Sequence, residues 1–354
     1  MPVESVRPVT QCPHHRTPSL EDLLDFPGWH VEDESGPRPS CVVSMGVQKV
    51  LHAELRSLME IHHLNCGTIA PFGGWLVAGT DMPWQRAELI CHCLLIETVD
   101  RLVLVDTGFG LKDVARPFKR LGAFTKLALM PRLEAAQTAV RQIERLGFVP
   151  GDVSDILITH LDSDHVGGVD DFPAARVHVY GHEGEIARLP ASLRERIRYR
   201  GRVELMQERG ELWTEHRPSR PQWRGFTRTQ PLADIAEEIF FLFLPGHTRG
   251  HAGVVIDTGS QERARWLVHA GDAYMHHDEM DITDPKCPPL TQAFQILVAE
   301  DNTERRRSAQ ELRRLAARSD VRVINAHSRP YLDHAEPTGL DDQAGQSNGG
   351  APRY

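Results

Sequence analysis

The sequence predicts an α/β protein in which two β-sheets are packed between layers of helices. Two observations carry this prediction. Short apolar runs of strand length alternate with helical patterns in both halves of the chain, and this alternation favours sheets covered by helices. Clusters rich in His and Asp follow several of the strand-like runs, as expected if strand ends gather at one rim of a sheet.

Both halves of the chain contain recognisable elements. Strands are expected at 89–97 and 101–106, where aliphatic residues dominate. Residues 132–146 have apolar positions at helical spacing, and Gly147 is a natural helix stop. Near the end of the chain, residues 303–318 fit a helix with a strongly basic outer face.

Composition divides the chain into three regions. Residues 1–45 hold seven of the 24 prolines without any periodicity, which predicts an irregular N-terminal arm. Residues 46–334 carry the strand-like runs and the polar clusters, and we expect them to form one catalytic domain. Residues 335–354 are rich in Gly, Asp, Gln and Pro, which predicts a disordered tail.

Charge and composition restrict the class of protein. The 354 residues are 40% apolar and 25% charged, as in a soluble globular enzyme that acts on a small-molecule substrate. The net charge of −9 argues against a nucleic-acid partner. No apolar run is long enough to span a membrane, and the first residues lack a cationic, apolar leader, which predicts a cytoplasmic protein. A homodimer is compatible with this composition.

Two further motifs contain residues that could bind a metal, but each has a simpler interpretation. Cys91-His92-Cys93 could bind a metal, but its apolar flanks favour small thiols buried in a strand. The pair His276-His277 lies shortly after a stronger candidate, Asp272, and either histidine could line a pocket.

Residues suited to metal binding occur in four clusters, each placed after a strand-like run. The clusters are 160–165, 245–251, 271–272 and 325–328. In an extended segment, residues two apart point the same way, so His160 and Asp162 share a face. The turn that follows lets Asp164 and His165 aim at a second metal. Imidazole and carboxylate suit zinc, but they also suit iron, manganese, cobalt or nickel.

The four clusters resemble the ligand set of the metallo-β-lactamase superfamily, whose signature is His-x-His-x-Asp-His with later His, Asp and His ligands. The resemblance covers roughly residues 65–330. Leu104-Val105-Asp106-Thr107-Gly108 is similar to the early Asp-Thr-Gly turn of the family. One position departs, because Asp162 stands where a His is usual. The resemblance implies a lactonase-like member with a four-layer αββα sandwich.

The resemblance also implies two metal ions held by seven side chains. It assigns His160, Asp162 and His247 to the first metal, and Asp164, His165 and His327 to the second, with Asp272 bridging both.

Supporting roles follow from the same resemblance. Asp106 is similar to the residue that hydrogen-bonds a ligand histidine, and Thr248 and His251 are expected to brace the loop around His247. Tyr274 is placed like a tyrosine that polarises the substrate carbonyl in lactonases. Packing in the core would explain Tyr274 equally well.

The acidic residue at position 162 changes the expected charge of the site. Three carboxylates instead of two against two divalent ions leave about one positive charge instead of about two. This should weaken the metals as Lewis acids, raise the pKa of bound water and favour harder ions. Zinc is expected, with iron or manganese as alternatives. A second interpretation is that Asp162 points away and leaves one metal position weak or empty.

Residues 187–232 lie where the superfamily often carries insertions. This Arg/Trp-rich insertion holds eleven arginines against five glutamates, in an otherwise acidic protein. Its arginines and aromatic residues could hold an anionic or amphiphilic substrate. Alternatively, it is a solvated helical insert whose tryptophans pack it down or seal a dimer interface.

The expected activity is that of a dinuclear metal-dependent hydrolase, an enzyme that uses a metal-bound hydroxide to open a small ester or lactone, such as an acyl-homoserine-lactone-like compound. Asp164 or Asp272 would accept the proton, and Tyr274 would assist at the oxyanion. Thioester or phosphoester hydrolysis are alternatives on the same fold. A di-iron redox protein and a low-turnover metal-containing binding protein are alternatives from other classes.

Overall fold

The computed structural model describes residues 59–79, 82–217, 222–260 and 264–333. The N-terminal arm predicted at 1–45 and the tail predicted at 335–354 lie outside the described residues. Within the described ranges, none of the helices combines the length and the apolar character that a membrane crossing requires.

The first sheet has seven strands in the order β4-β1-β2-β3-β5-β6-β7. The strands are β1 (Glu60–Ile69), β2 (Leu89–Glu97), β3 (Leu102–Val105), β4 (Pro131–Arg132), β5 (Val153–Ile158), β6 (Arg176–Tyr180) and β7 (Trp213–His216). The strands predicted at 89–97 and 101–106 are therefore confirmed as β2 and β3. Because β3, β5, β6 and β7 run parallel, their carboxyl ends share one edge of the sheet.

The second sheet has five strands in the order β12-β11-β10-β9-β8. The strands are β8 (Thr229–Pro231), β9 (Ile239–Phe243), β10 (Ala252–Asp257), β11 (Trp266–His269) and β12 (Val321–Ile324). Only the β11–β12 pair is parallel in this sheet. The carboxyl ends of β11 and β12 therefore lie side by side, which matters for the site described below.

Helices occupy the connections between strands. They are α2 (Trp75–Ala78), α3 (Leu111–Ala115), α4 (Pro117–Ala128), α5 (Ala139–Arg145), α6 (Ser163–Val166), α7 (Gly181–Arg188), α8 (Leu193–Arg198), α9 (Arg202–Arg209), α10 (Pro289–Val298), α11 (Asn302–Ala316) and α12 (Arg329–Asp333). The helix predicted at 303–318 is confirmed as α11, which buries Leu312 and Leu315.

The helix predicted at 132–146 is only half right. Its second half is α5, which buries Val140 and Ile143 as expected. Its first half does not continue the helix, because Arg132 pairs with β1 and Thr138 has an extended backbone, with φ −61° and ψ 148°. The Thr138 hydroxyl donates to the Ala135 carbonyl, a local hydrogen bond that replaces helical continuation.

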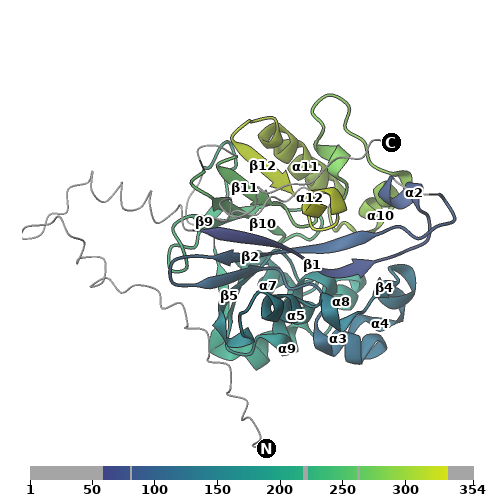
Figure 1. Cartoon of the computed structure of the whole chain (residues 1–354). Helices are drawn as coiled ribbons and strands as arrows, with labels where there is room; N and C mark the ends of the chain where they lie inside the picture. Colours follow the sequence, from purple (N-terminus) through teal and green to yellow (C-terminus); the bar gives the residue numbers. More distant parts are fainter. Residues whose placement is uncertain (1–58, 80–81, 218–221, 261–263, 334–354) are drawn as a thin grey trace, which may run out of the picture. The chain divides into compact units, whose positions relative to one another are not determined.

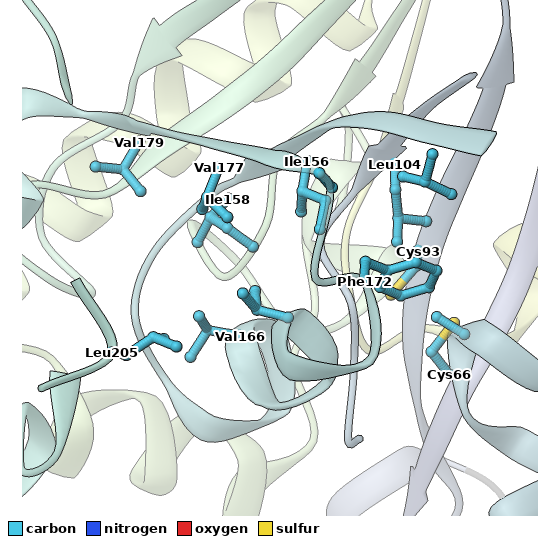
Figure 2. Packing of buried hydrophobic residues seen from close by; sticks show 14 of the residues in the cluster. Cys66, Cys93, Leu104, Ile156, Ile158, Val166, Phe172, Val177, Val179 and Leu205 are labelled. Atoms are coloured by element: carbon cyan, nitrogen blue, oxygen red, sulfur yellow. The ribbon is translucent and has the colours of Figure 1, made fainter. Parts of the chain in front are cut away.

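The two sheets pack face to face between helical layers, which makes the four-layer αββα sandwich. Alternate residues of β5 point to opposite faces of the first sheet. Leu157 packs in the apolar cluster shared with the second sheet, whereas Ile156 and Ile158 pack under helices α5, α7 and α9. Figure 1 shows these helices below the sheets and α11 on the opposite side. Figure 2 shows the helical side of this core, where Phe172 and Val166 face the strand residues.

A buried polar chain crosses the parallel part of the first sheet. The Asp155 carboxylate on β5 accepts hydrogen bonds from Arg101 Nη1 and bonds His178 Nε2, each at 2.9 Å. His178 Nδ1 is in turn 2.8 Å from His216 Nε2. Burial raises the pKa of Asp155, but the bonds from His178, Ser154 and Arg101 outweigh it and lower that pKa to about 2.

We expect Asp155→Asn to destabilise the fold by about 2 kcal/mol at neutral pH, because the lowered pKa of Asp155 stabilises the folded state only while the group is ionised. The difference from the parent should persist above the ordinary pKa of 3.8 and disappear as the pH falls towards about 2. Urea unfolding followed by circular dichroism measures it. Asp100→Asn, at an exposed position, is the control. Equal stability of Asp155→Asn and the parent at pH 7 would contradict the assignment.

Candidate metal centre

Four segments leave the sheets at one rim and carry the predicted ligands. β5 ends at Ile158, just before His160, and β12 ends at Ile324, just before His327. β11 ends shortly before Asp272, and His247 lies in the loop between β9 and β10. The strand ends therefore bring residues that are distant along the chain to one place, as the sequence predicted.

The ligand-type side chains form two adjacent groups. One group is His160, His247 and Asp272, and the other is Asp164, His165 and His327. Within each group, one potential ligand atom per residue lies within 4.8 Å of the others. Two groups of this composition are suited to two divalent cations.

Asp272 stands between the two groups. Its Oδ1 lies 3.3 Å from His165 Nε2 and 3.1 Å from His327 Nε2. Its Oδ2 lies 3.6 Å from His247 Nε2, 4.0 Å from His160 Nε2 and 3.1 Å from His327 Nε2. A carboxylate with an oxygen turned towards each group has the orientation that a bridging ligand needs.

Asp162 and Asp164 complete the cluster from the first ligand segment. Asp162 Oδ2 lies 3.1 Å from His247 Nε2 and 3.5 Å from His160 Nε2, so its side chain points into the first group. The alternative in which Asp162 points away does not describe this structure. Asp164 Oδ2 lies 3.8 Å from His165 Nε2 and 3.7 Å from His327 Nε2, on the side of the second group.

The electrostatics of the cluster fit cations. His160 Nε2, His165 Nε2 and Asp272 Oδ1 are buried, and none of them has a hydrogen-bond partner within the part of the chain that the structure describes, although they face one another. Burial by itself would lower the pKa of His327, but Asp272 and Asp164 raise it to about 9. The buried carboxylates are therefore stable in their ionised form only if positive charge lies close to them. Divalent metal ions would meet that demand and satisfy the unpaired nitrogen and oxygen atoms together.

The predicted supporting residues lie behind the ligands. Asp106 Oδ2 is 2.8 Å from His165 Nδ1, and its Oδ1 accepts from the Thr159 backbone N–H at 2.8 Å. His251 Nε2 accepts from the backbone N–H of Asp272 at 3.0 Å. Thr248 donates to Glu183 at 2.7 Å. These contacts fix the ring of one ligand and the backbones of the other ligand loops.

The approach to Asp272 depends on the glycine before it. Gly271 has φ +52°, in the left-handed region, and a Cβ there would lie 2.6 Å from His251 Nε2. Only glycine therefore permits both the turn after β11 and the hydrogen bond from Asp272 to His251.

A pocket of about 620 Å³ opens beside the second group. His327 forms part of its wall, and both His276 and His277 line it, in agreement with the expectation for that pair. Arg132 and Arg329 also line the pocket, where each forms an ion pair with Glu88, at 2.5 and 3.1 Å. The pocket wall therefore contains more arginines than carboxylates.

Tyr274 is the predicted site residue whose surroundings differ from the expectation. Its side chain is fully buried in the apolar cluster between the second sheet and α11, and its hydroxyl donates to the Tyr331 hydroxyl at 3.1 Å. Among the described residues, no hydrogen bond joins Tyr274 to the ligand cluster. Core packing, the alternative interpretation, accounts for this residue, and we assign it no role with substrate.

The ligand loops are held from behind by residues that no motif in the sequence predicts. Arg198 on α8 contacts Asp162, and Arg202 on α9 donates to the Leu161 carbonyl at 2.8 Å. The Glu183 carboxylate on α7 accepts from Leu161 N–H and Tyr199 O–H, and burial raises its pKa to about 7. The excess of arginines in 187–232 is the one signal in the sequence, and two of these arginines contact the back of the site rather than substrate or solvent.

Cys91-His92-Cys93 is part of β2 and is buried. Burial raises the pKa of the Cys91 and Cys93 thiols well above the ordinary value. This environment favours packing over metal binding, since a thiolate ligand needs a lowered pKa.

The sequence is similar to that of known metal-dependent hydrolases. The family model of the Metallo-beta-lactamase superfamily matches residues 86–318. A probable metallo-hydrolase of Mycobacterium tuberculosis is 40% identical over 282 residues, which cover 79% of this chain and 84% of that protein. The N-acyl homoserine lactonase AiiA of Bacillus thuringiensis subsp. kurstaki is 23% identical over 176 residues, which cover 50% of this chain and 62% of that protein.

Solved structures share the fold. An N-acyl homoserine lactone hydrolase with N-hexanoyl-L-homoserine bound at its catalytic metal centre has a TM-score of 0.56 at 18% identity, over 78% of this chain and 96% of that chain. A dizinc quorum-quenching lactonase has a TM-score of 0.52 at 16% identity, over 77% and 88% of the two chains.

We expect Asp106→Asn to weaken metal binding by roughly 10- to 100-fold, because an amide supports the His165 ring without the negative charge that raises its basicity. Competition against a chromophoric chelator measures the affinity. Asp113→Asn is the matched control, since Asp113 is also a buried carboxylate but bonds Gly110 and Arg120 rather than a ligand. Unchanged affinity in Asp106→Asn would contradict this role.

Proposed function

This chain belongs to the metallo-beta-lactamase superfamily of metal-dependent hydrolases, and we propose that it uses two divalent metal ions to open a small ester, with a lactone as the best single candidate. One observation carries the proposal. Two groups of imidazole and carboxylate ligands meet at Asp272 beside a pocket large enough for a small substrate.

The seven residues would divide between the two ions. His160, Asp162 and His247 would hold one, Asp164, His165 and His327 would hold the other, and Asp272 would bridge them. When bound, such ions supply a Lewis acid for a carbonyl oxygen and lower the pKa of a bound water. Zinc suits this nitrogen-rich set, and the three carboxylates keep iron and manganese as alternatives.

The protein itself contributes orientation and proton transfer. Asp106 and His251 fix His165 and the backbone of Asp272, so the ligands are already in place before substrate arrives. A proton released by the attacking water needs a nearby carboxylate. Asp164 is suited to this because its side chain is 13% exposed, whereas Asp272 is almost enclosed. Either residue could pass the proton to the leaving alkoxide.

A lactone is favoured by two independent considerations. The relatives and neighbours named above include N-acyl homoserine lactonases, which act on such a ring. The pocket beside His327 presents Arg132, Arg329 and two histidines, groups that can receive the polar ends of a small ester and its carboxylate product. Thioester and phosphoester hydrolysis use the same kind of centre and stay as alternatives within the class.

One observation also supports a redox alternative. Asp162 points into the first group, so the site offers three carboxylates, and oxygen ligands favour harder ions such as iron. Purification without added metal separates the two possibilities. An iron-loaded, coloured protein that consumes oxygen would support redox chemistry, and a colourless zinc protein would support hydrolysis.

We expect the chain purified without added metal to carry about two divalent ions and to release acid from an acyl-homoserine lactone. His165→Ala and Asp272→Asn should each lower this rate by at least about 1,000-fold, because each removes a ligand that holds or links the ions. Elemental analysis and a pH-indicator assay measure the two properties. A glutathione thioester and a phosphodiester, tested alongside, report the alternatives.

The folding control for these variants is circular dichroism, which should match the parent. Glu185→Gln, at an exposed position on α7, should keep the parental rate. Near-parental turnover in Asp272→Asn would contradict the proposed centre. Turnover of the thioester alone would retain the centre and replace the substrate.

A further inference from the structure

Asp162 has a charged partner that the superfamily signature does not include. While its Oδ2 faces His160 and His247, its Oδ1 lies 3.0 Å from Nε of Arg198. The two carboxylate oxygens are therefore divided between the first ligand group and a guanidinium.

Arg198 is held rigidly in this position. Its side chain is only 10% exposed. Nη1 donates to the His247 carbonyl at 3.0 Å and to Glu300 Oε1 at 3.2 Å, and Nη2 donates to the Val298 carbonyl at 2.9 Å. Each guanidinium nitrogen thus has a partner, and the side chain cannot turn towards the pocket without losing several hydrogen bonds.

Arg198 shares a small ion-pair network with Glu300, Arg249 and Glu195, in which Arg249 lies 2.8 Å from Glu195. Glu300 also accepts from the Arg249 backbone N–H at 2.8 Å, and the Arg249 side chain lies 3.8 Å from it. Glu300 therefore has a second cation nearby. Among the described residues, Arg198 is the only cationic side chain of Arg or Lys type in an ion pair with Asp162.

We propose that Asp162 and Arg198 act as one unit that takes the place of the neutral imidazole usual at this position of the signature. The carboxylate supplies the ligand oxygen, and the guanidinium cancels its charge and fixes which oxygen faces the metal. This inference rests on the proposed metal centre. It makes Arg198 a positioning residue, since it reaches the metal only through Asp162.

The ion pair between Asp162 and Arg198 changes the net charge that the sequence predicts for the metal site. Three carboxylates against two divalent ions leave about one positive charge, and the guanidinium beside Asp162 adds to it, although Arg198 is shared with Glu300. The charge balance at the first metal position then lies closer to that of a centre with two carboxylates. The ions should accordingly be stronger Lewis acids than the third carboxylate alone implies.

A purely structural role for Arg198 makes a different prediction. Arg198 donates to the carbonyls of His247 and Val298, and these two hydrogen bonds would hold both segments in place whichever residue occupies position 162. If bracing were its only function, loss of Arg198 would damage metal binding to the same extent with Asp or His at position 162. If the two residues act as a unit, the effects of replacing them should be strongly coupled.

The experiment is a double-mutant cycle on the full chain, read by metal affinity. Zinc affinity is measured by competition with a chromophoric chelator, and the visible spectrum of the cobalt(II) form reports ligand geometry. Asp162→His should weaken binding of the first ion by at least about tenfold, because it removes the nearer carboxylate that offsets the Arg198 charge beside that ion and leaves Glu300 as the ion-pair partner of Arg198. Adding Arg198→Met to Asp162→His should restore the affinity to within about threefold of the parent and give a parental cobalt spectrum.

Two further variants in the Asp162→His background sharpen the test. Arg198→Lys keeps the charge, so it should not restore affinity, whereas Arg198→Gln should restore it and replaces Arg198→Met if that chain does not fold. Arg194→Met is the matched control. Arg194 lies one turn earlier on α8 and donates to the Ala299 carbonyl at 2.8 Å, next to the Val298 carbonyl that Arg198 uses. It should restore nothing.

The outcomes separate this inference from the proposed function. Additive losses in the cycle, or full affinity in Asp162→His alone, would overturn the pairing while leaving the centre intact. Absence of bound divalent metal in the parent chain would instead overturn the centre on which both depend. Restoration by Arg198→Lys would also overturn the pairing, because it would show that charge cancellation is not involved.

Discussion

The candidate metal centre depends on one buried carboxylate, Asp272, which is stable as an anion only with positive charge close to it. Asp272 is enclosed where the second sheet ends, and its two oxygens face imidazoles that come from both sheets. Neither sheet can supply this arrangement alone, since His160 and His165 follow β5, whereas Asp272 and His327 follow β11 and β12. The face-to-face packing of the sheets is therefore also what assembles the candidate metal centre.

The ligand set was predicted from its resemblance to the signature of the superfamily, and it stays a prediction. What the residues themselves indicated is that the His and Asp clusters follow strand ends, and the structure places these clusters at one rim. The helix expected at 132–146 failed in its first half because one local hydrogen bond at Thr138 and pairing of Arg132 with β1 outweighed a periodic pattern. Tyr274 could not be placed from sequence, because the direction of its side chain depends on the packing around Tyr331.

The insertion shows a further limit of the sequence. Its arginines looked available for substrate or solvent, yet Arg198 and Arg202 turn inward and donate to the loops that carry His247 and Asp162. These contacts join positions 36 to 49 residues apart, and no periodicity encodes them. Only the composition indicates such contacts: the insertion is rich in arginine, and the additional carboxylate of Asp162 among buried ligands needs a positively charged partner.

Joining Asp162 to Arg198 also constrains how this sequence can change during evolution. Histidine at position 162 would leave the buried guanidinium of Arg198 with Glu300 as its ion-pair partner, and loss of Arg198 would leave the Asp162 carboxylate without its guanidinium partner. The residues at positions 162 and 198 are therefore expected to change together among related sequences. An exchange of one ligand type for the other would pass through an intermediate in which one of the two residues has lost its partner.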